Sequence, residues 1–217
     1  ANYLECASEQ VEDWYYTNAN GVAFSLAERE RVLSAAVRER LAGKDLSPQA
    51  LTAPVYAEAA GFDETTRMQY LDLWFWIVGD ILLKTDKMAM AHSLESRVPF
   101  LDREVFELAA TIPLAQKVTE EQTKVTLRQA AERAVPRDWA QKEKLGFPVP
   151  VVSWLREPRY YERVKRAFTG ATAMRFFDVG ELVRLLDEHL AGADNSRRIW
   201  IVYSFLIWHS VYFEEVE

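Results

Sequence analysis

Apolar residues recur every three or four positions along most of the chain, which is the spacing that one face of an α-helix requires. Alternation of apolar and polar residues, the pattern of a half-buried strand, is almost absent. The few glycines and prolines cluster between the periodic segments, where helices are expected to end. The pattern therefore predicts an all-α chain. Six of the expected helices run over Arg103 to Ala110, Thr123 to Ala134, Val152 to Leu155, Tyr160 to Ala167, Val179 to Leu190 and Arg197 to Phe213.

Two further segments carry more specific signals. From Ser25 to Leu41 the apolar residues form one stripe, and Ser25 forms a capping box with Glu28, so one amphipathic helix is expected. From Asp63 to Leu83, with Asp63 as the N-cap, almost every side of the helix would be apolar. This pattern predicts a central helix that is buried on most sides. The last helix is rich in aromatic residues and is expected to dock on the core.

The composition supports a single folded region over residues 1–217. About half of the 217 residues are apolar and 12% are aromatic, which is enough for a dry core and argues against disorder. The formal net charge is −7, without a long block of either sign, so no nucleic-acid partner is expected. Apolar runs such as Leu73 to Val78 fall far short of the roughly 20 residues that cross a bilayer, and no leader-like segment opens the sequence. We therefore expect a soluble protein with no membrane partner.

Cysteine and histidine usage limits the chemistry further. Cys6 is the only cysteine, so an internal disulfide is excluded and a cytoplasmic location is expected. A nucleophilic role for its thiol is chemically open, but a packed or incidental cysteine is the commoner case. His92, His189 and His209 are too scattered in the sequence for a zinc site, so no metal ligand is predicted.

An unusual stretch follows the apolar helix, from Ile81 to Asp102, with the sequence ILLKTDKMAMAHSLESRVPFLD. Charged residues are interspersed there with methionine, leucine, valine and phenylalanine, which would place charge within a core. Such charges are costly unless they are paired or face a cavity, so we expect ion pairs, a site lining or both. A buried network without a catalytic role is an equally open interpretation. The charged residues concerned are Asp80, Lys84, Asp86, Lys87, Glu95, Arg97 and Asp102.

Pro99 divides this stretch. A proline restricts the residue before it to extended geometry, so the helix must end before Pro99. Glu95 and Arg97 are then expected at the mouth of a site, beside a sharp turn. Asp102 is expected to be the N-cap of the next helix, which is mainly a structural role.

A second cluster of charge lies further along, where Lys142, Glu143 and Lys144 run into the stiff segment Leu145 to Pro150. Charged residues followed by a loop with a glycine and prolines suit the edge of a site. Taken alone, the cluster would be described as a solvated Lys-Glu-Lys turn.

The stretch from Ile81 to Asp102 resembles the pattern LLxxD(K/R)x(S/A)MAx(S/G)(L/V)ExRxPFLD of the glutamine-hydrolysing asparagine synthetase family. So long an ungapped match is specific, and the KLGFPVP segment resembles bacterial members. The matching residues are Leu82, Leu83, Asp86, Lys87, Ala89, Met90, Ala91, Ser93, Leu94, Glu95, Arg97, Pro99, Phe100, Leu101 and Asp102.

The resemblance implies a fold of which this chain is one part. It identifies the chain as the helical C-terminal portion of an α/β synthetase domain of the ATP pyrophosphatase type. Family members also carry an SGGxDS pyrophosphate loop on a parallel sheet, a GxGxDE segment, and a glutaminase domain with an N-terminal catalytic cysteine. None of these occurs in the sequence. The resemblance therefore predicts a fragment that is inactive alone.

The resemblance also implies a reaction and roles for individual residues. The parent enzyme would activate aspartate as an acyl-adenylate with ATP and Mg²⁺, release pyrophosphate, and form asparagine with ammonia derived from glutamine. Lys142 is carried over as the catalytic, phosphate-contacting residue. Asp80 is a candidate for an acidic residue that faces the intermediate, or equally a cap or an ion-pair partner of a nearby lysine. The expected wall of the site consists of Asp86, Lys87, Glu95 and Arg97.

Several points stay open at this stage. No ATP or Mg²⁺ is expected to bind this fragment, and a homodimer of the parent is compatible with the sequence. The β-lactam synthetases and lasso-peptide cyclases reuse the same adenylating domain on other carboxylates. A helical interaction module without chemistry is the alternative from another class. It would need an exposed apolar patch, and it does not explain the charges before Pro99.

Overall fold

The computed structural model describes residues 10–16, 23–143 and 149–214. Within these residues all regular secondary structure is helical, and β pairing is limited to two isolated bridges, Leu33 with Phe177 and Val118 with Thr123. The all-α prediction is therefore confirmed for the part of the chain that the structure describes.

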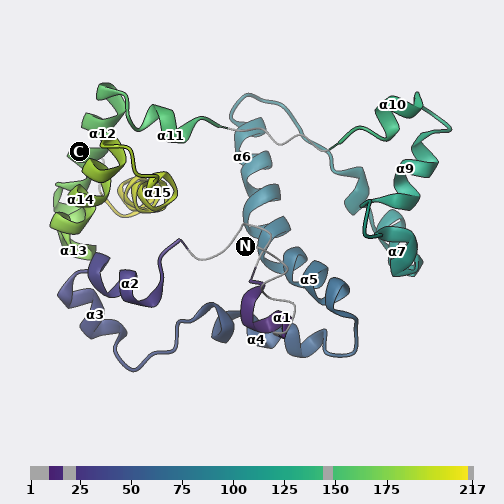
Figure 1. Cartoon of the computed structure of the whole chain (residues 1–217), viewed down its shortest axis with the longest axis horizontal. Coiled ribbons are helices and arrows are strands. Elements are labelled where there is room, and N and C mark those ends of the chain that lie inside the picture. The colour runs from purple at the N-terminus through teal and green to yellow at the C-terminus, as the bar shows by residue number, and fades with distance from the viewer. Residues whose placement is uncertain (1–9, 17–22, 144–148, 215–217) are drawn as a thin grey trace. The chain divides into compact units, whose positions relative to one another are not determined.

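Contacts between residues divide the chain into two compact units, one within Ala1–Ile81 and Val149–Glu217 and the other within Leu82–Pro148. Figure 1 labels most of the helices. The helices of the first unit are α1 (Val11–Trp14), α2 (Leu26–Val32), α3 (Ala35–Leu41), α4 (Pro48–Glu58), α5 (Glu64–Asp72), the π-helix η1 (Leu73–Leu82) at whose end the second unit begins, α11 (Val151–Trp154), α12 (Pro158–Phe168), α13 (Ala171–Phe176), α14 (Val179–Leu190) and α15 (Ser196–Phe213). Those of the second unit are α6 (Leu83–Met90), the 3-10 helix η2 (Pro99–Leu101), α7 (Arg103–Thr111), α8 (Leu114–Lys117), α9 (Val125–Ala131) and α10 (Arg137–Ala140).

The main core of the first unit is formed by α12, α14 and α15, which pack on one another, with α2 and α13 against them. Phe168, Leu186 and Ile199, one from each of the three central helices, have no exposed surface. The helical spacing of such apolar residues is the reason that these helices could be predicted. The structure has the predicted bounds for α14, and α12 and α15 begin and end within two residues of the prediction.

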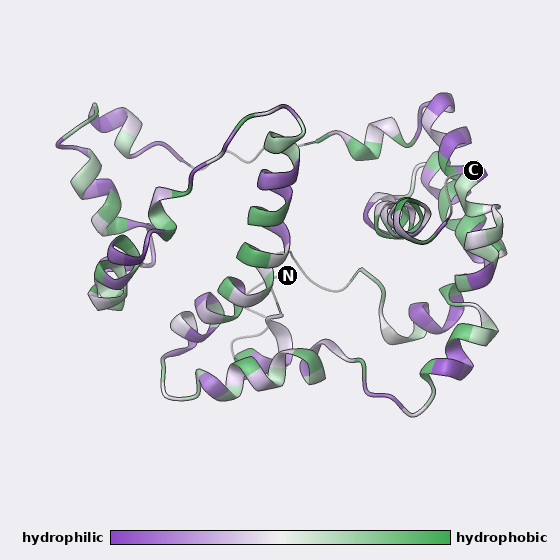
Figure 2. Cartoon of the chain, turned by 180° about the vertical axis from the view of Figure 1, so that it is seen from behind, coloured by the Kyte–Doolittle hydropathy of each residue, from purple (hydrophilic) through white to green (hydrophobic). Residues whose placement is uncertain are grey.

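The predicted docking of the last helix is confirmed, but mainly through aliphatic residues. Val202 and Leu206 of α15 are buried in the core. Phe205 adds edge contacts to the rings of Phe176 and Phe177, with centroid distances of 5.2 and 5.5 Å. Other aromatic residues of α15, including Trp200 and Trp208, lie on its exposed side. Figure 2 shows that hydrophobic and hydrophilic residues both occur along the helices of this unit.

A second, smaller core joins α1, α4 and α5. Val11, Tyr56 and Leu71 are buried there, and the Tyr56 hydroxyl donates a hydrogen bond to the Tyr15 carbonyl oxygen at 2.7 Å. Burial raises the pKa of the Tyr56 hydroxyl well above its usual range, so Tyr56 stays a neutral donor. The Tyr15 hydroxyl donates to an Asp72 carboxylate oxygen at 2.7 Å, so the polar end of each of these two buried tyrosines has a hydrogen-bonding partner.

The single helix predicted from Ser25 to Leu41 is wrong, because the structure has two helices, α2 and α3. The capping box is confirmed, since the side chains of Ser25 and Glu28 each accept a hydrogen bond from the other's backbone N–H. Leu33 ends α2 in an extended conformation and forms a bridge with Phe177, and Ser34 then caps α3. A contact that is distant in sequence thus interrupts a helix that periodicity alone would continue.

The predicted burial of the helix from Asp63 to Leu83 is also wrong. Asp63 does cap α5 and accepts a hydrogen bond from the backbone N–H of Thr66 at 3.0 Å. Within α5 and η1, however, Leu71 is the only buried side chain, and Trp74 and Val78 are 55% and 60% exposed. The pattern shows that this helix lacks a polar face, but it does not say which neighbours would cover it.

Among the described residues, several short helices and one longer one lie outside the predicted ranges. Helix α4 follows a Ser47 cap and contains Pro54, which interrupts the regular spacing of apolar residues. Helices α1, α8, α10 and α13 are four to six residues long. Segments this short span little more than one helical turn, so they carry few apolar repeats from which a helix can be predicted.

Candidate functional site

The stretch from Ile81 to Asp102 enters the second unit as α6, which ends at Met90. An irregular connection then leads to η2, which begins at Pro99, so the predicted helix end before this proline is confirmed. Asp102 caps α7 as predicted. Its carboxylate accepts hydrogen bonds from the backbone N–H groups of Glu104 and Val105 at 3.0 and 3.4 Å.

Glu95 and Arg97 lie in this connection and form an ion pair, with 2.8 Å between a carboxylate oxygen and Nη2. The expected pairing is therefore confirmed for these two residues. The expectation that charge lies within a core is wrong for this stretch, because the neighbouring Met88, Leu94 and Phe100 are exposed. The two charged side chains are themselves 69% and 80% exposed, and an exposed ion pair contributes only about 0–1 kcal/mol to stability.

We expect Glu95→Ala and Arg97→Ala each to change the free energy of unfolding of this chain by less than about 1 kcal/mol, because solvent screens the pair. Urea unfolding would measure the change. Arg103→Ala, which breaks the exposed ion pair of Arg103 with Glu107, is a matched control and should behave alike. A loss above about 2 kcal/mol for Arg97→Ala alone would show that this pair holds the fold together.

Asp80 lies in the last turns of the π-helix η1 and is half-buried. Asp86 and Lys87 lie on α6 with exposed side chains. Turns of π-helix are rare, and those that occur are often found at functional sites. The position of Asp80 is therefore more distinctive than the positions of Asp86 and Lys87. Asp80 belongs to the first unit, whereas the other five predicted site residues belong to the second.

Lys142 directly follows α10 and the capping Gln141, and its side chain is exposed. Its Nζ lies 6.0 Å from the centroid of the Trp139 ring, which is the outer limit of a cation–π contact. Its backbone N–H donates to the Trp139 carbonyl oxygen at 3.3 Å. The rest of the predicted site edge, from Lys144 to Pro148, lies outside the described residues, as does Cys6.

Sequence reasoning misses Arg128, a half-buried residue of α9 that holds the backbone at Lys142. Its Nη1 donates to the carbonyl oxygens of Ala140 and Lys142, both at 3.0 Å, and its Nε donates to that of Thr123 at 3.1 Å. In the sequence this residue is one of several arginines on helices. Its acceptors are backbone atoms, which leave no side-chain pattern that could have marked it.

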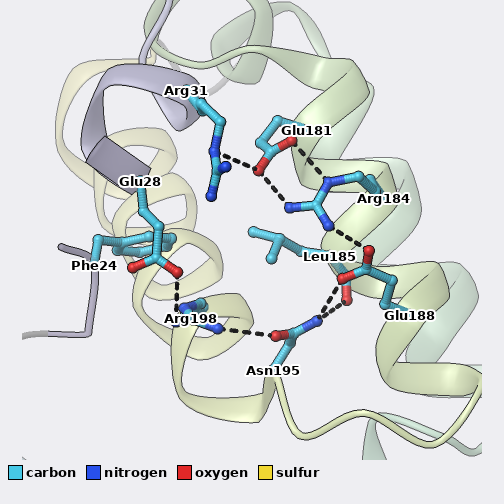
Figure 3. Close-up of a pocket in the computed structure, with 9 residues that line it drawn as sticks. All are labelled: Phe24, Glu28, Arg31, Glu181, Arg184, Leu185, Glu188, Asn195 and Arg198. Atoms are coloured by element: carbon cyan, nitrogen blue, oxygen red, sulfur yellow. Dashed lines mark hydrogen bonds and ion pairs between the residues drawn. The ribbon is translucent and has the colours of Figure 1, made fainter. Parts of the chain in front are cut away.

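A charged pocket lies in the first unit between α2, α14 and α15, and Figure 3 shows its side chains pointing toward one another. Arg198 of α15 pairs with Glu28 of α2 at 2.6 Å. Arg184 of α14 pairs with Glu181 at 2.5 Å and also with Glu188. The pocket is lined by Phe24, Glu28, Arg31, Glu181, Arg184, Leu185, Glu188, Asn195 and Arg198.

The electrostatics of this pocket are those of a closed network. The backbone N–H of Ser25 lowers the pKa of Glu28, and the hydrogen bonds from Arg184 lower the pKa of Glu181. Hydrogen bonds to the carboxylates of Glu181 and Glu188 raise the pKa of Arg184. Since the lining arginines each face a carboxylate, the network joins three helices and presents little uncompensated charge to a ligand. None of the six predicted site residues lines this pocket.

His189 is a fully buried histidine whose two ring nitrogens both have partners. Its Nδ1 accepts from the Asn195 backbone N–H at 3.2 Å, which leaves Nε2 to donate to the Val152 carbonyl oxygen at 2.9 Å. Among residues 10–16, 23–143 and 149–214, no three His, Cys, Asp or Glu side chains are grouped to hold a metal ion. In the same ranges, no helix combines the length and the apolar character needed to cross a membrane.

Comparison with known proteins adds evidence that the geometry alone does not contain. The family model described as asparagine synthase matches residues 5–210. A protein of Mycobacterium tuberculosis, provisionally named a glutamine-hydrolysing asparagine synthetase, is 43% identical over 97% of this chain and 31% of its own length. The glutamine-hydrolysing asparagine synthetase 1 of Bacillus subtilis is 38% identical over 98% of this chain and 32% of its own length.

A more distant relative is the glutamine-hydrolysing asparagine synthetase 3 of Bacillus subtilis, which is 28% identical over 66% of this chain and 25% of its own length. No solved structure is significantly similar to the chain. The chain spans about a third of the length of the first curated relatives that it matches.

Proposed function

The chain belongs to the asparagine synthase family, and from this premise we propose that it is the helical C-terminal part of a glutamine-hydrolysing asparagine synthetase. In the longer parent protein, the side-chain carboxylate of aspartate would attack the α-phosphorus of ATP and pyrophosphate would leave. Ammonia would then attack the acyl carbonyl and displace AMP, which yields asparagine. Glutamine hydrolysis would supply the ammonia.

The observation that carries this proposal is the combination of an exposed side chain and a fixed backbone at Lys142. Its carbonyl oxygen accepts a hydrogen bond from Nη1 of Arg128 at 3.0 Å. A lysine ammonium is a compact point charge. Placed at the phosphates of ATP, it would stabilise the negative charge that grows as pyrophosphate leaves. The family match over residues 5–210 includes Lys142. We therefore propose Lys142 as the catalytic and nucleotide-binding residue of this chain.

The remaining site residues have proposed roles that follow from their chemistry. Asp80, half-buried in the π-helix η1, would face the intermediate. Asp86 and Lys87, together with the ion pair of Glu95 and Arg97, would form the wall of the site. The cationic side chain of Lys142 fits the phosphates of ATP. We assign no Mg²⁺ ligand, since the described residues contain no group of three suitable side chains.

The proposal extends to the parts of the parent that this chain does not contain. A parallel sheet with the pyrophosphate loop and an N-terminal glutaminase domain would complete the enzyme, and residues 1–217 would form one helical region of its synthetase domain. The chain alone would be inactive and would bind neither ATP nor Mg²⁺. A cytoplasmic parent, with a homodimer as one possible assembly, fits the same proposal.

One observation favours a second candidate, a helical interaction module. The outer side of α15 exposes Trp200, Ile207, Trp208 and Tyr212, and these residues recur at helical spacing, so they form the apolar patch that a partner would need. This candidate does not account for the resemblance of the charged stretch before Pro99 to the family pattern. An amide-forming relative that acts on another carboxylate is the remaining alternative.

Pyrophosphate release by the full-length parent tests these alternatives. We expect release from ATP to depend on aspartate, with asparagine and AMP formed in equal amounts when glutamine or ammonia is present, and no release from this chain alone. Glutamate in place of aspartate is a control that should give little release. Release that depends on a β-amino acid or a peptide instead would favour the related synthetases. A parent that releases no pyrophosphate with any carboxylate would favour the interaction module.

A further inference from the structure

Two segments meet at Arg128, one five residues before it and the other 12 to 14 residues after it. The first is the turn that leads into α9, where the Thr123 carbonyl oxygen accepts a hydrogen bond from Nε of Arg128 at 3.1 Å. The second follows α10, where the carbonyl oxygens of Ala140 and Lys142 both accept from Nη1 at 3.0 Å. Helices α9 and α10 also pack on each other, as Figure 1 shows. One guanidinium therefore joins the segment that carries Lys142 to the start of α9.

The residue next to Lys142 is held by a second set of bonds. The side-chain amide of Gln141 accepts a hydrogen bond from Gln122 at 2.6 Å and donates one to Glu132 at 2.5 Å. The oxygen and the nitrogen of this amide therefore both have hydrogen-bonding partners. Gln122 precedes α9 and Glu132 is its C-cap. The backbone of Ala140 to Lys142 is thus fixed on two sides, whereas the Lys142 side chain remains exposed.

An arginine suits this place better than a lysine would. Its planar guanidinium carries five donors in a fixed arrangement, so it can bond acceptors from two segments at once. A lysine has one flexible ammonium and would not span the same three carbonyl oxygens. Arg128 is also only half-exposed, which keeps its bonds away from full competition with water.

We propose that Arg128 is a positioning residue that sets the place of the Lys142 ammonium during adenylation, an inference that rests on the proposed function of Lys142. The lysine side chain is long and flexible, so the position of its ammonium group depends on the position of the backbone to which it is attached. A displacement of about 1 Å in a catalytic group can lower turnover on the order of 100-fold. Releasing the Lys142 carbonyl would let the whole segment move while the charge itself stays present.

The test uses the full-length parent with Arg128→Ala, Arg128→Lys and Lys142→Ala, and with Arg133→Ala as a matched control at an exposed arginine five residues further along. We expect both Arg128 variants to lower kcat for aspartate-dependent pyrophosphate release by roughly 10- to 100-fold. The KM for aspartate and the glutaminase rate should change less than 3-fold. Guanidinium ion added to Arg128→Ala should restore part of kcat, whereas it should not restore Lys142→Ala.

Each result decides the inference. An unchanged kcat in a folded Arg128→Lys variant would overturn the inference. It would also be overturned if activity falls only in proportion to the loss of folded protein and guanidinium ion does not restore it. If Arg128→Ala does not fold, Arg128→Lys alone decides in the same way. A normal rate for Lys142→Ala would instead overturn the proposed function. A slow Lys142→Ala beside normal Arg128 variants would overturn only the positioning role.

Discussion

Lys142→Ala in the full-length parent should lower the rate of aspartate-dependent pyrophosphate release by a factor of about 10²–10³, which is the usual effect of removing one fixed electrostatic donor from a transition state. The rate of glutamine hydrolysis should stay close to that of the unchanged enzyme, because that reaction would occur in another domain. The measurement is pyrophosphate release at saturating ATP and aspartate, with glutamate production from glutamine followed in parallel.

Lys117, a half-buried lysine at the end of α8 in the same unit, offers a control for the loss of a lysine side chain. Its Nζ lies 3.4 Å from the Ala110 carbonyl oxygen, so it is a partnered lysine remote from the Lys142 segment in sequence. Lys117→Ala should leave pyrophosphate release unchanged within about 2-fold. If Lys142→Ala and Lys117→Ala release pyrophosphate equally fast, Lys142 has no part in adenylation.

The second large effect concerns stability. Phe168→Ala should destabilise the core of the first unit by about 3–5 kcal/mol, because it removes a large buried ring and leaves a cavity that helices can only partly close. Phe168 has no exposed surface and belongs to the cluster that includes Leu186 and Ile199. Amide hydrogen exchange in α14 and α15 of this chain would measure the loss locally, which matters because the chain has two units.

Phe62→Ala is the corresponding control, since it makes the same chemical change at a side chain that is 57% exposed. It should change protection in α14 and α15 by less than about 0.5 kcal/mol. Equal protection losses in the two variants would mean that the cluster around Phe168 is not the cooperative core of this unit.

Local signals in the sequence predicted a large part of the fold. The capping residues Ser25, Asp63 and Asp102 all accept the backbone hydrogen bonds expected of them. Helix α14 has the predicted bounds. Caps and amphipathic stripes depend on residues three or four places apart, so a single sequence contains nearly all that determines them.

The errors occur where a helix depends on something distant. Leu33 ends a helix because it meets Phe177, far along the chain. Trp74 and Val78 are exposed although their helix has almost no polar residue, because apolar character does not create a covering layer within this chain. The apolar side chains beside Glu95 and Arg97 are exposed for the same reason.

The candidate site also has one part that the sequence determines and another that only the tertiary structure determines. Residue identity and order are enough to relate the stretch from Ile81 to Asp102 to a family, because the match is one of types at fixed spacing. Lys142 could be singled out in the same way. The contribution of Arg128 could not, since it bonds carbonyl oxygens that every residue possesses. Only the folding of α9 against α10 brings those atoms within 3.0 Å of its guanidinium, and hydrogen bonds of this kind depend on position in space and not on residue type.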